Sequence, residues 1–330
     1  MSVCDCMRVG VMGINYKSSS LELREILART FQKVFGRSQV NNHVLLSTCN
    51  RTELYFGEPL ADRHIQILGK LKEEIDVSFE HALYSYFGKD CFNHLGRVIS
   101  GVDSAIFGES DIQRQVKRSY EKVRVRSTLS SEIHYLFQKG LKIGKEIRSS
   151  FLMSNKELPL PQAIQSIIHW HGYPLEAAKI LLVGNSSINR KLLSFFQHLG
   201  KKGITLATRM KTEIPQDVVC SDWEALKKWD QFDVVICGTI HEGYVLPKLE
   251  RVSKKTLLFD LSIPRNIPPE FQKNPQLKLY NIDQIGEVAA ERKSEKEIAL
   301  CETLIEKAVA RQMKLFVQRR EAKWRYATAL

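Results

Sequence analysis

The chain has 330 residues, 43% of them hydrophobic, which is enough for two or three domains that each have a core of their own. Its formal charge of +12 favours a polyanionic partner such as nucleic acid, although a generally basic surface that serves solubility is the alternative. The sequence has no apolar run of membrane-spanning length and no secretion signal, and its seven cysteines show neither CxxC pairs nor zinc-ligand spacing. These features exclude membrane proteins and secreted disulfide-rich proteins, and they predict a reduced, cytoplasmic protein without a metal site.

The N-terminal part alternates strands and helices in the order β-α-β-β-α-β. We expect strands over 7–15, 43–48, 52–57 and 82–87, and helices over 21–35 and 62–75. The first helix has apolar residues at helical period, and the serines before it can cap its start. This order predicts a ferredoxin-like domain with the turn around Cys49 at one edge of the sheet.

The turn around Cys49 carries a cysteine close to Arg51 at the end of a strand. A thiolate is a far better nucleophile than a thiol, and a neighbouring cation lowers a cysteine pKa. Reactive groups also concentrate on loops that a rigid scaffold holds in place. Judged by the local sequence alone, a small apolar residue that closes a core strand is the more common case, because cysteine is among the most buried residue types. The remaining motifs decide between the two interpretations.

A helical block follows, with helices expected over 90–99, 111–125 and 131–149. The second and third of these helices are rich in lysine and arginine. Such residues form either solvated helix faces or a surface for a phosphate backbone. The basic residues are Arg114, Lys117, Arg118, Lys122, Arg124 and Arg126, followed by Lys139, Lys142, Lys145 and Arg148.

The second half of the chain begins at a boundary that Pro159 and Pro161 mark, since proline pairs break regular elements. A helix is expected over 162–171, then strands that alternate with helical segments, which is the pattern of a parallel Rossmann-like sheet. The expected strands are 179–183, 204–208, 232–237, 256–261 and 277–281, and a helix follows the first of them over 190–199.

The expected turn over 184–189 resembles a dinucleotide-binding loop, G-x-G-x-x-G, but keeps only its first glycine. Ser186 stands where the backbone approaches the pyrophosphate, and Asn189 stands where the helix packs on the strand. The helix N-terminus can still hold a phosphate. The next strand ends at Arg209 and Lys211, which suit the 2′-phosphate of NADP better than the ribose hydroxyl of NAD, unless both are ordinary surface cations. The residues expected to bind the cofactor are Gly184, Asn185, Ser186, Ser187, Ile188, Asn189 and Arg209.

From Ile285 onward the chain is expected to form one long charged helix, without proline or glycine after Gly286. About 40 residues would extend for roughly 60 Å, so this helix should brace the two domains or pair with another chain. The complete prediction is a multi-domain α/β protein. It has a ferredoxin-like catalytic domain with added helices over 1–155, a Rossmann-like NADP domain over 156–284 and the long helix over 285–330.

Several spaced motifs in this order resemble those of glutamyl-tRNA reductases, and the resemblance covers nearly the whole chain. The motifs lie at 47–53, 101–109, 113–116, 136–139, 259–267 and 280–283. The resemblance implies that Cys49 attacks the ester of glutamyl-tRNA(Glu) and forms a thioester. NADPH would then reduce this thioester to glutamate-1-semialdehyde in the first step of the five-carbon route to tetrapyrroles such as haem.

The resemblance also assigns site residues. Arg51 would pair bidentately with a carboxylate of glutamate, and Glu109 would accept a hydrogen bond from the substrate's ammonium group. His94 would take part in proton transfer, with a structural helix histidine as the alternative. The implied substrate-binding residues are Thr48, Asn50, Arg51, Ser104, Glu109, Ser110, Asp111 and Gln115.

The chain also departs from the family pattern. Glu109-Ser110-Asp111 replaces the usual Glu-Pro-Gln, and the sequence ends at Leu330, where a dimerisation domain would be missing or reduced. A homodimer therefore stays open, and the aminomutase that consumes the aldehyde is an implied partner. The glycine-poor loop leaves a second hypothesis, a tRNA-binding esterase of glutamyl-tRNA or a regulatory protein with impaired nucleotide binding. A third hypothesis is a small-molecule dehydrogenase without a role in tRNA chemistry.

Overall fold

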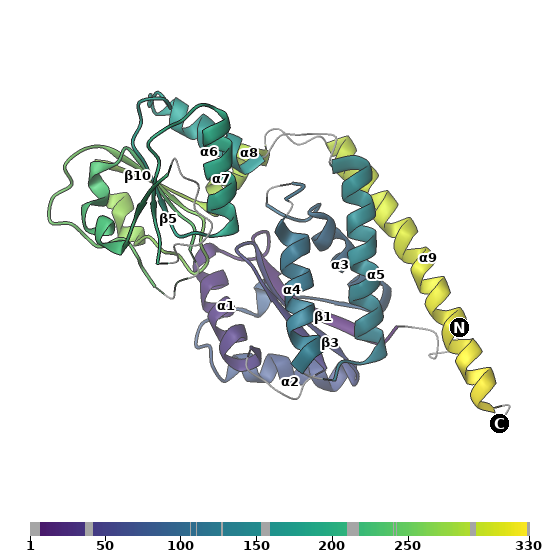
Figure 1. Ribbon diagram of the computed structural model, residues 1–330. Helices are drawn as coiled ribbons and strands as arrows, with labels where there is room; N and C mark the ends of the chain where they lie inside the picture. Colours follow the sequence, from purple (N-terminus) through teal and green to yellow (C-terminus); the bar gives the residue numbers. More distant parts are fainter. Residues whose placement is uncertain are drawn as a thin grey trace. The chain divides into compact units, whose positions relative to one another are not determined.

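The computed structural model describes residues 7–36, 42–105, 107–109, 111–126, 128–152, 159–209, 218–239, 241, 243–290 and 295–328 (Figure 1). The chain divides into two compact units, and each is described by itself below. The first unit comprises residues 1–156 and 293–330, and the second comprises residues 157–292.

The first unit is built on a four-stranded sheet in the order β2-β3-β1-β4, with antiparallel neighbours throughout. Its strands are β1 (Val9–Asn15), β2 (His43–Ser47), β3 (Arg51–Gly57) and β4 (Tyr84–Phe87). β1 and β3 are buried along their whole lengths because they occupy the middle of the sheet. The chain order and sheet order confirm the predicted ferredoxin-like domain.

One face of this sheet is covered by α1 (Leu21–Phe35) and α2 (Leu60–Lys72). The Ser20 side chain accepts a hydrogen bond from the Leu23 N–H, so it caps α1 as the sequence predicts. Leu54 and Phe56 of β3 point into the core on this face, together with Phe31 of α1. A short 3₁₀ helix (Glu80–Ala82) leads from α2 into β4.

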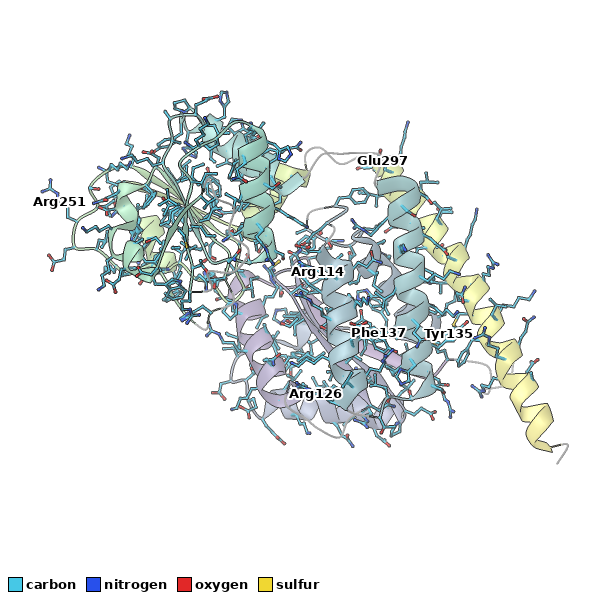
Figure 2. All side chains as sticks on the ribbon, viewed as in Figure 1. Arg114, Arg126, Tyr135, Phe137, Arg251 and Glu297 are labelled. Carbon is cyan, nitrogen blue, oxygen red and sulfur yellow. The ribbon has the colours of Figure 1, made fainter. Side chains whose placement is uncertain are left out.

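The opposite face is covered by α3 (Gly88–Ser100), α4 (Asp111–Arg126) and α5 (Ser131–Ile147), after which a π-helical turn runs from Arg148 to Leu152. Tyr55 of β3 stacks edge-on against Phe137 of α5, with ring centroids 5.3 Å apart. Tyr135, on the same helix, donates a hydrogen bond to the Gln312 carbonyl at 2.9 Å (Figure 2). Most basic residues of α4 and α5 are exposed, among them Lys117, Arg118, Lys122, Arg124, Arg126, Lys142 and Lys145.

The C-terminal part contains two described helices, and residues 291–294 between them, which the helix expected from Ile285 includes, lie outside the described residues. α8 (Ile282–Ala290) belongs to the second unit, where Ile282 and Ile285 are buried. α9 (Glu295–Thr328) belongs to the first unit and runs alongside α3 and α5 (Figure 1). Gly96 of α3 permits this packing, because a Cβ there would lie 2.8 Å from the Ile305 side chain. The two helices therefore have different hydrophobic partners.

The second unit contains a six-stranded parallel sheet in the order β10-β9-β8-β5-β6-β7, which confirms the Rossmann-like prediction. Its strands are β5 (Ile180–Val183), β6 (Thr205–Ala207), β7 (Val219–Ser221), β8 (Val234–Cys237), β9 (Thr256–Asp260) and β10 (Leu277–Asn281). The sequence did not predict β7, a three-residue strand at the edge of the sheet.

The helices of the second unit are α6 (Pro159–Trp170) and α7 (Ser187–His198), with 3₁₀ helices over Trp223–Gln231 and Pro269–Lys273. Pro159 and Pro161 lie in the first turn of α6 rather than before the helix. Proline is compatible with that turn because the missing N–H has no intrahelical partner there. Within the described residues, no helix is long and apolar enough to cross a membrane.

Candidate active site

The Cys49 turn joins β2 to β3 and is held by one threonine. The Thr48 N–H donates to the Arg51 carbonyl at 2.8 Å, and the Thr48 hydroxyl accepts from the N–H groups of Asn50 and Arg51, each at 3.2 Å. Cys49 is half-buried at the tip of this turn. The predicted nucleophile is therefore reachable from solvent on a turn whose backbone is fixed.

Two other segments converge on this turn. The Tyr16 N–H donates to the Asn50 carbonyl at 2.9 Å, and the Tyr16 hydroxyl donates to the Ser104 carbonyl at 3.4 Å. The Asn50 side-chain amide donates to a Glu109 carboxylate oxygen at 3.4 Å. These contacts bring Ser104 and Glu109, two of the predicted substrate-binding residues, to the turn that carries Cys49.

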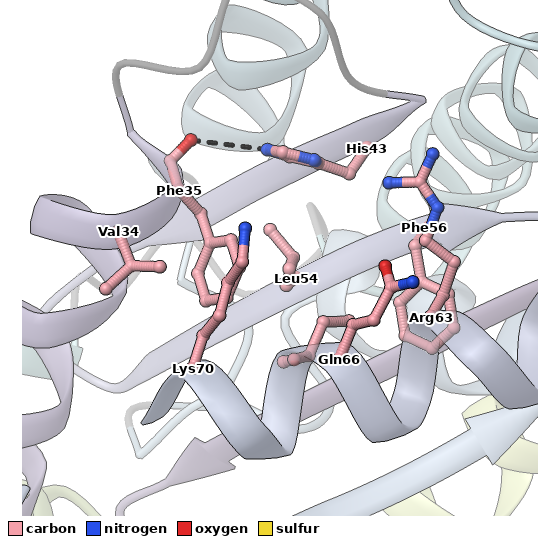
Figure 3. A pocket seen from close by; sticks show the side chains of 9 residues that line it. Val34, Phe35, His43, Leu54, Phe56, Arg63, Gln66 and Lys70 are labelled. Carbon is pink, nitrogen blue, oxygen red and sulfur yellow. Dashed lines mark hydrogen bonds between the residues drawn. The ribbon is translucent and has the colours of Figure 1, made fainter. Parts of the chain in front are cut away.

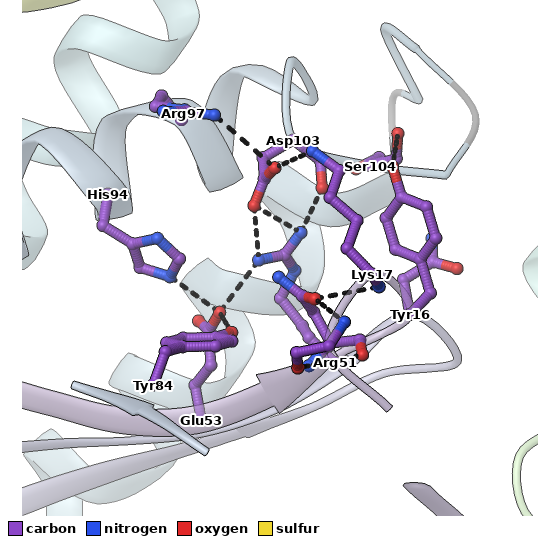
Figure 4. A network of polar contacts seen from close by, with 12 residues as sticks. Tyr16, Lys17, Arg51, Glu53, Tyr84, His94, Arg97, Asp103 and Ser104 are labelled. Atoms are coloured by element: carbon purple, nitrogen blue, oxygen red, sulfur yellow. Dashed lines mark hydrogen bonds and ion pairs between the residues drawn. The ribbon is translucent and has the colours of Figure 1, made fainter. Parts of the chain in front are cut away.

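Beneath the turn, Arg51 is fully buried and bound to two carboxylates (Figure 4). Its Nη1 lies 2.8 Å from Glu53 Oε1 and 3.2 Å from Asp103 Oδ2. Its Nη2 donates to the Asp103 carboxylate at 3.2 Å and also to the Asp103 backbone carbonyl. A substrate carboxylate would have to displace one of these partners to bind Arg51 as the sequence analysis expected. The structure therefore places Arg51 in the support of the turn.

Glu53 is the centre of the buried network. Its carboxylate accepts hydrogen bonds from Arg51, from the hydroxyls of Tyr55 and Tyr84 at 2.6 Å each, and from His94 Nε2 at 2.8 Å. Burial alone would raise the pKa of Glu53, but the His94 ring and the Arg51 guanidinium hold it well below its usual range. An ionised carboxylate only accepts, so His94 Nε2 carries a proton. Nδ1 is then the His94 nitrogen that remains for proton transfer.

Asp103 links this buried network to the surface. Lys17 Nζ, on a half-exposed side chain, lies 2.6 Å from Asp103 Oδ1, and Arg97 Nη2 lies 3.8 Å from the same oxygen. Burial would raise the pKa of Asp103, but the charges of Arg51 and Lys17 lower it below the ordinary value. A fixed negative charge at Asp103 keeps the guanidinium of Arg51 in place.

Three buried polar atoms near the turn have no hydrogen-bond partner among the residues that the structure describes, Arg51 Nε, Asn50 Oδ1 and Ser104 Oγ. The last two are on residues that are 4% and 1% exposed. Buried polar groups are nearly always hydrogen-bonded, so each has capacity for a polar ligand. All three residues belong to the predicted substrate-binding set.

The other predicted substrate residues lie on or before α4. Asp111 is buried at the first position of α4, and its Oδ1 accepts from Arg114 Nη2 at 3.0 Å. Gln115 is half-buried one helical turn further on, on the same face. Ser110 lies outside the described residues. The geometry thus groups Thr48, Asn50, Arg51, Ser104 and Glu109 around the turn that carries Cys49, and His94 joins this group through Glu53. Asp111 and Gln115 lie on α4.

The sequence analysis assigned no role to Glu53, Asp103 or Tyr84. A signal was present for Glu53, since Arg51, Glu53 and Tyr55 alternate along one strand and must share a face. An arginine and a carboxylate on one face of a central strand indicate a buried ion pair. No local pattern indicated Asp103, which lies 52 positions from Arg51 in the chain.

A cavity lies on the other face of this sheet, between α1 and α2 (Figure 3). It has a volume of about 90 Å³, and Leu54, Phe56, Arg63 and Lys70 are among the residues that line it. His43 Nε2 lies 3.2 Å from the Phe35 carbonyl at the end of α1, so this histidine gives a hydrogen-bond partner to a carbonyl that has none within the helix. The cavity does not include Cys49.

In the second unit, the nucleotide-type loop is shorter than the sequence analysis expected. α7 begins at Ser187 rather than after Asn189, because the Ser186 side chain accepts from the Asn189 N–H and caps the helix. Gly184 has φ +93°, a backbone conformation that favours glycine. Asn185 and Ile188 are half-buried on either side of the cap. The loss of the second glycine is thus accompanied by a helix cap.

Asn189 replaces the third glycine by filling the space between α7 and the sheet. Its side-chain amide donates to the carbonyls of Val183 and Gly184, each at 2.8 Å, and the residue is 1% exposed. Gly238, just after β8, provides the room, because a Cβ there would lie 2.8 Å from Asn189 Oδ1 and 3.0 Å from Ile188 Cγ2. The glycine needed for close packing lies on the neighbouring strand end instead of on the helix.

This arrangement makes Gly238→Ala a sharp test of the loop. We expect the added methyl group to push the first turn of α7 away from β5 and to cost about 1–3 kcal/mol of unfolding free energy. The affinity for nucleotide should also fall, because the α7 N-terminus would move. Urea unfolding and titration with nucleotide measure the two effects. Gly69→Ala is the matched control, because a Cβ at Gly69 would meet nothing within 4 Å, and it should be neutral or slightly stabilising. Equal behaviour of the two variants would contradict this account.

Arg209 follows β6, as predicted, and its guanidinium lies over the Trp223 ring at 4.4 Å. Lys211, the second predicted cation, lies outside the described residues. The α7 N-terminus lies beyond the carboxyl end of β5. β5 is the strand at which the order of the sheet reverses, because β6 lies on one side of it and β8 on the other. This is where doubly wound sheets bind nucleotides. The positive φ at Gly184 and the helix terminus after it fit a nucleotide phosphate. Among the described residues, no group of three or more metal-ligating side chains could hold an ion.

The two units together define a class of enzyme. The first carries a half-exposed cysteine above a buried charge network, and the second carries a nucleotide-type Rossmann sheet, so the chain is an oxidoreductase that uses a nucleotide cofactor. Residues 12–151 match the family described as glutamyl-tRNAGlu reductase, N-terminal domain, and residues 168–288 match shikimate/quinate 5-dehydrogenase.

Comparison with whole proteins identifies the family. The glutamyl-tRNA reductase of Chlamydia abortus is 33% identical over 272 residues, which cover 78% of this chain and 78% of that protein. That of Akkermansia muciniphila is 28% identical and covers 92% of this chain and 97% of its own. The solved structure of glutamyl-tRNA reductase from Methanopyrus kandleri shares the fold, with a TM-score of 0.51 and 23% identity over 96% of this chain and 82% of that one. The chain belongs to the glutamyl-tRNA reductase family.

Proposed function

We propose that this chain reduces the glutamyl group of glutamyl-tRNA(Glu) to glutamate-1-semialdehyde with NADPH, through a thioester on Cys49. The observation that carries the proposal is the turn itself. It presents a half-exposed thiol beside two buried polar atoms that lack partners among the described residues, Asn50 Oδ1 and Ser104 Oγ. A polar acyl group held by these atoms would meet the sulfur.

The first step uses only residues of the first unit. The Cys49 thiolate attacks the ester carbonyl, the C–S bond forms and the C–O bond to the tRNA breaks. The departing oxygen of the tRNA must gain a proton, and the Cys49 thiol loses one when the thiolate forms. His94 Nδ1 can carry this proton from the thiol to the oxygen, because Glu53 holds Nε2. Glu109, joined to Asn50, offers a carboxylate for the ammonium group of the glutamyl moiety. The product of this step is an acyl-enzyme with free tRNA.

The second step requires a hydride donor. The α7 N-terminus and Arg209 would hold NADPH, which would supply the hydride that reduces the thioester carbonyl. The C–S bond then breaks, and Cys49 leaves as a thiolate. The single cation described at the end of β6, Arg209, supports NADPH over NADH because a guanidinium pairs well with a phosphate.

The exposed cations of α4 and α5 support an RNA substrate. Lys117, Arg118 and Lys122 follow one another on the solvent side of α4, where a phosphate backbone can reach them. Lys117 also lies 3.8 Å from Glu121 in an exposed pair, which weakens its field only slightly. We infer that this surface contributes to tRNA binding.

A product assay tests the proposal. Incubation with glutamyl-tRNA and NADPH should yield the aldehyde, whereas incubation without NADPH should yield only free glutamate, because water then cleaves the thioester. NADH should support a slower reaction than NADPH. Free glutamate as the only product at saturating NADPH would favour the second candidate function, an esterase. The observation that favours this alternative is the loop with one of three glycines.

A further inference from the structure

Arg148 differs from the other basic residues of the helical block. It follows α5 directly as the first residue of the π-helical turn, it is half-buried, and its Nη1 donates to three backbone carbonyls. These belong to Ser100 at 3.3 Å, Gly108 at 3.2 Å and Glu109 at 2.7 Å. A guanidinium that is committed to carbonyl groups is not available for a phosphate backbone, which corrects its place among the predicted surface cations.

The three carbonyls belong to the two ends of one loop. Ser100 is the last residue of α3, and Gly108 and Glu109 precede α4. The loop closes on itself as well, since the Gly108 N–H donates to the Gly101 carbonyl at 3.0 Å. Gly101 has φ +80°, and a Cβ there would lie 3.0 Å from the Glu109 carbonyl oxygen. Arg148 therefore fastens a loop whose ends already lie in close contact.

This loop carries the groups that face the Cys49 turn. Ser104 lies within it, and Glu109 at its end receives the hydrogen bond from Asn50. Burial lowers the pKa of Arg148, whereas the carboxylates of Glu109 and Asp111 act in the opposite direction. The cation thus offsets the negative charge that gathers at the start of α4.

We propose that Arg148 is a positioning residue that holds the described loop residues 101–105 and 107–109 against the Cys49 turn and so sets the place of Glu109 for the ammonium group of the substrate. The inference rests on the proposed function, because it needs Glu109 to contact the glutamyl group. π-Helical turns often occur at functional sites, and this one begins at the residue in question.

Arg148→Met tests the inference through the split between KM and kcat. Loss of the three hydrogen bonds should raise KM for glutamyl-tRNA by about 10-fold or more and change kcat by less than about 3-fold, because Cys49 is held separately by Thr48. In Arg148→Lys, KM should return most of the way to that of the unmodified protein, since an ammonium has three donors for three carbonyls. Lys89→Met, which removes an exposed charge at the start of α3, should leave KM unchanged. A KM for Arg148→Met equal to that of the unmodified protein would overturn the proposal.

Two further readouts distinguish a positioning role for Arg148 from direct contact with phosphate. If Arg148 contacted phosphate, its replacement would reduce the salt dependence of KM, whereas a positioning role leaves the slope of log KM against log salt unchanged. Protection of Cys49 from iodoacetamide by glutamyl-tRNA needs no hydride transfer. It should be strong in the unmodified protein and weak in Arg148→Met, and equal protection in both would also overturn the proposal. Absence of aldehyde from the unmodified protein would instead count against the proposed function alone.

Discussion

Replacing Cys49 with serine should reduce aldehyde formation from glutamyl-tRNA by at least about three orders of magnitude. A serine hydroxyl is a much weaker nucleophile than a thiolate at neutral pH, because it stays protonated there. The substitution is nearly isosteric and Cys49 is half-buried, so unfolding free energy should change by less than about 0.5 kcal/mol. Quantification of the aldehyde after a single turnover measures the effect.

Cys220→Ser is the matched control, because Cys220 is an exposed cysteine on β7 of the other unit. It should retain full activity. Burial raises the pKa of Cys91, Cys237 and Cys301, so these thiols should react slowly with iodoacetamide. Alkylation should therefore inactivate the protein with the kinetics of one site. Full aldehyde formation by Cys49→Ser would refute the thioester mechanism.

Replacing Glu53 with glutamine should have the second largest effect, on stability and on activity together. Removal of one partner from a buried ion pair costs roughly 3–5 kcal/mol, because the other charge is left uncompensated. Arg51 would keep Asp103, so the lower part of that range is expected. His94 would lose the acceptor that fixes its Nε2 proton, and kcat should fall by about 100-fold. Urea unfolding and the pH profile of kcat measure the two losses.

Glu80→Gln makes the same change at an exposed carboxylate that pairs with Lys72 at 3.0 Å. It should change the unfolding free energy only slightly, because exposed ion pairs contribute little. An equally small effect at Glu53 would show that the buried network does not support the turn.

The pH dependence of stability follows from the lowered pKa of Glu53, which His94 and Arg51 maintain against the effect of burial. A carboxyl whose pKa is lower in the folded state stabilises the fold above its unfolded pKa, about 4.3 for glutamate. This stabilisation is lost as the pH falls through the folded pKa. The difference in unfolding free energy between the unmodified protein and Glu53→Gln should therefore be constant near neutral pH and should shrink below about pH 4.

The local sequence was sufficient for most of the fold. The strands β1 and β3 and the helical period of α1 were predicted because each depends on residues within one element. β7 was missed because three residues carry too little periodic signal. The assignment of α8 and α9 to different units was not predicted, because the chain contains neither proline nor glycine after Gly286 and the residues that pack on each helix come from distant segments.

The candidate site, like the fold, has parts that the local sequence predicts and parts that depend on distant segments. The sequence predicts Cys49, its turn and the neighbouring residues as a site, because a short motif at the end of a strand is local information. The contacts of Arg51, Asn189 and Arg148 depend on segments that are distant in the chain. Arg51 binds Asp103 across 52 positions, Gly238 makes room for Asn189 from another strand, and Arg148 reaches Gly108 across 40 positions. Packing sets the burial of these residues and their hydrogen bonds to distant segments, and local sequence patterns do not indicate either.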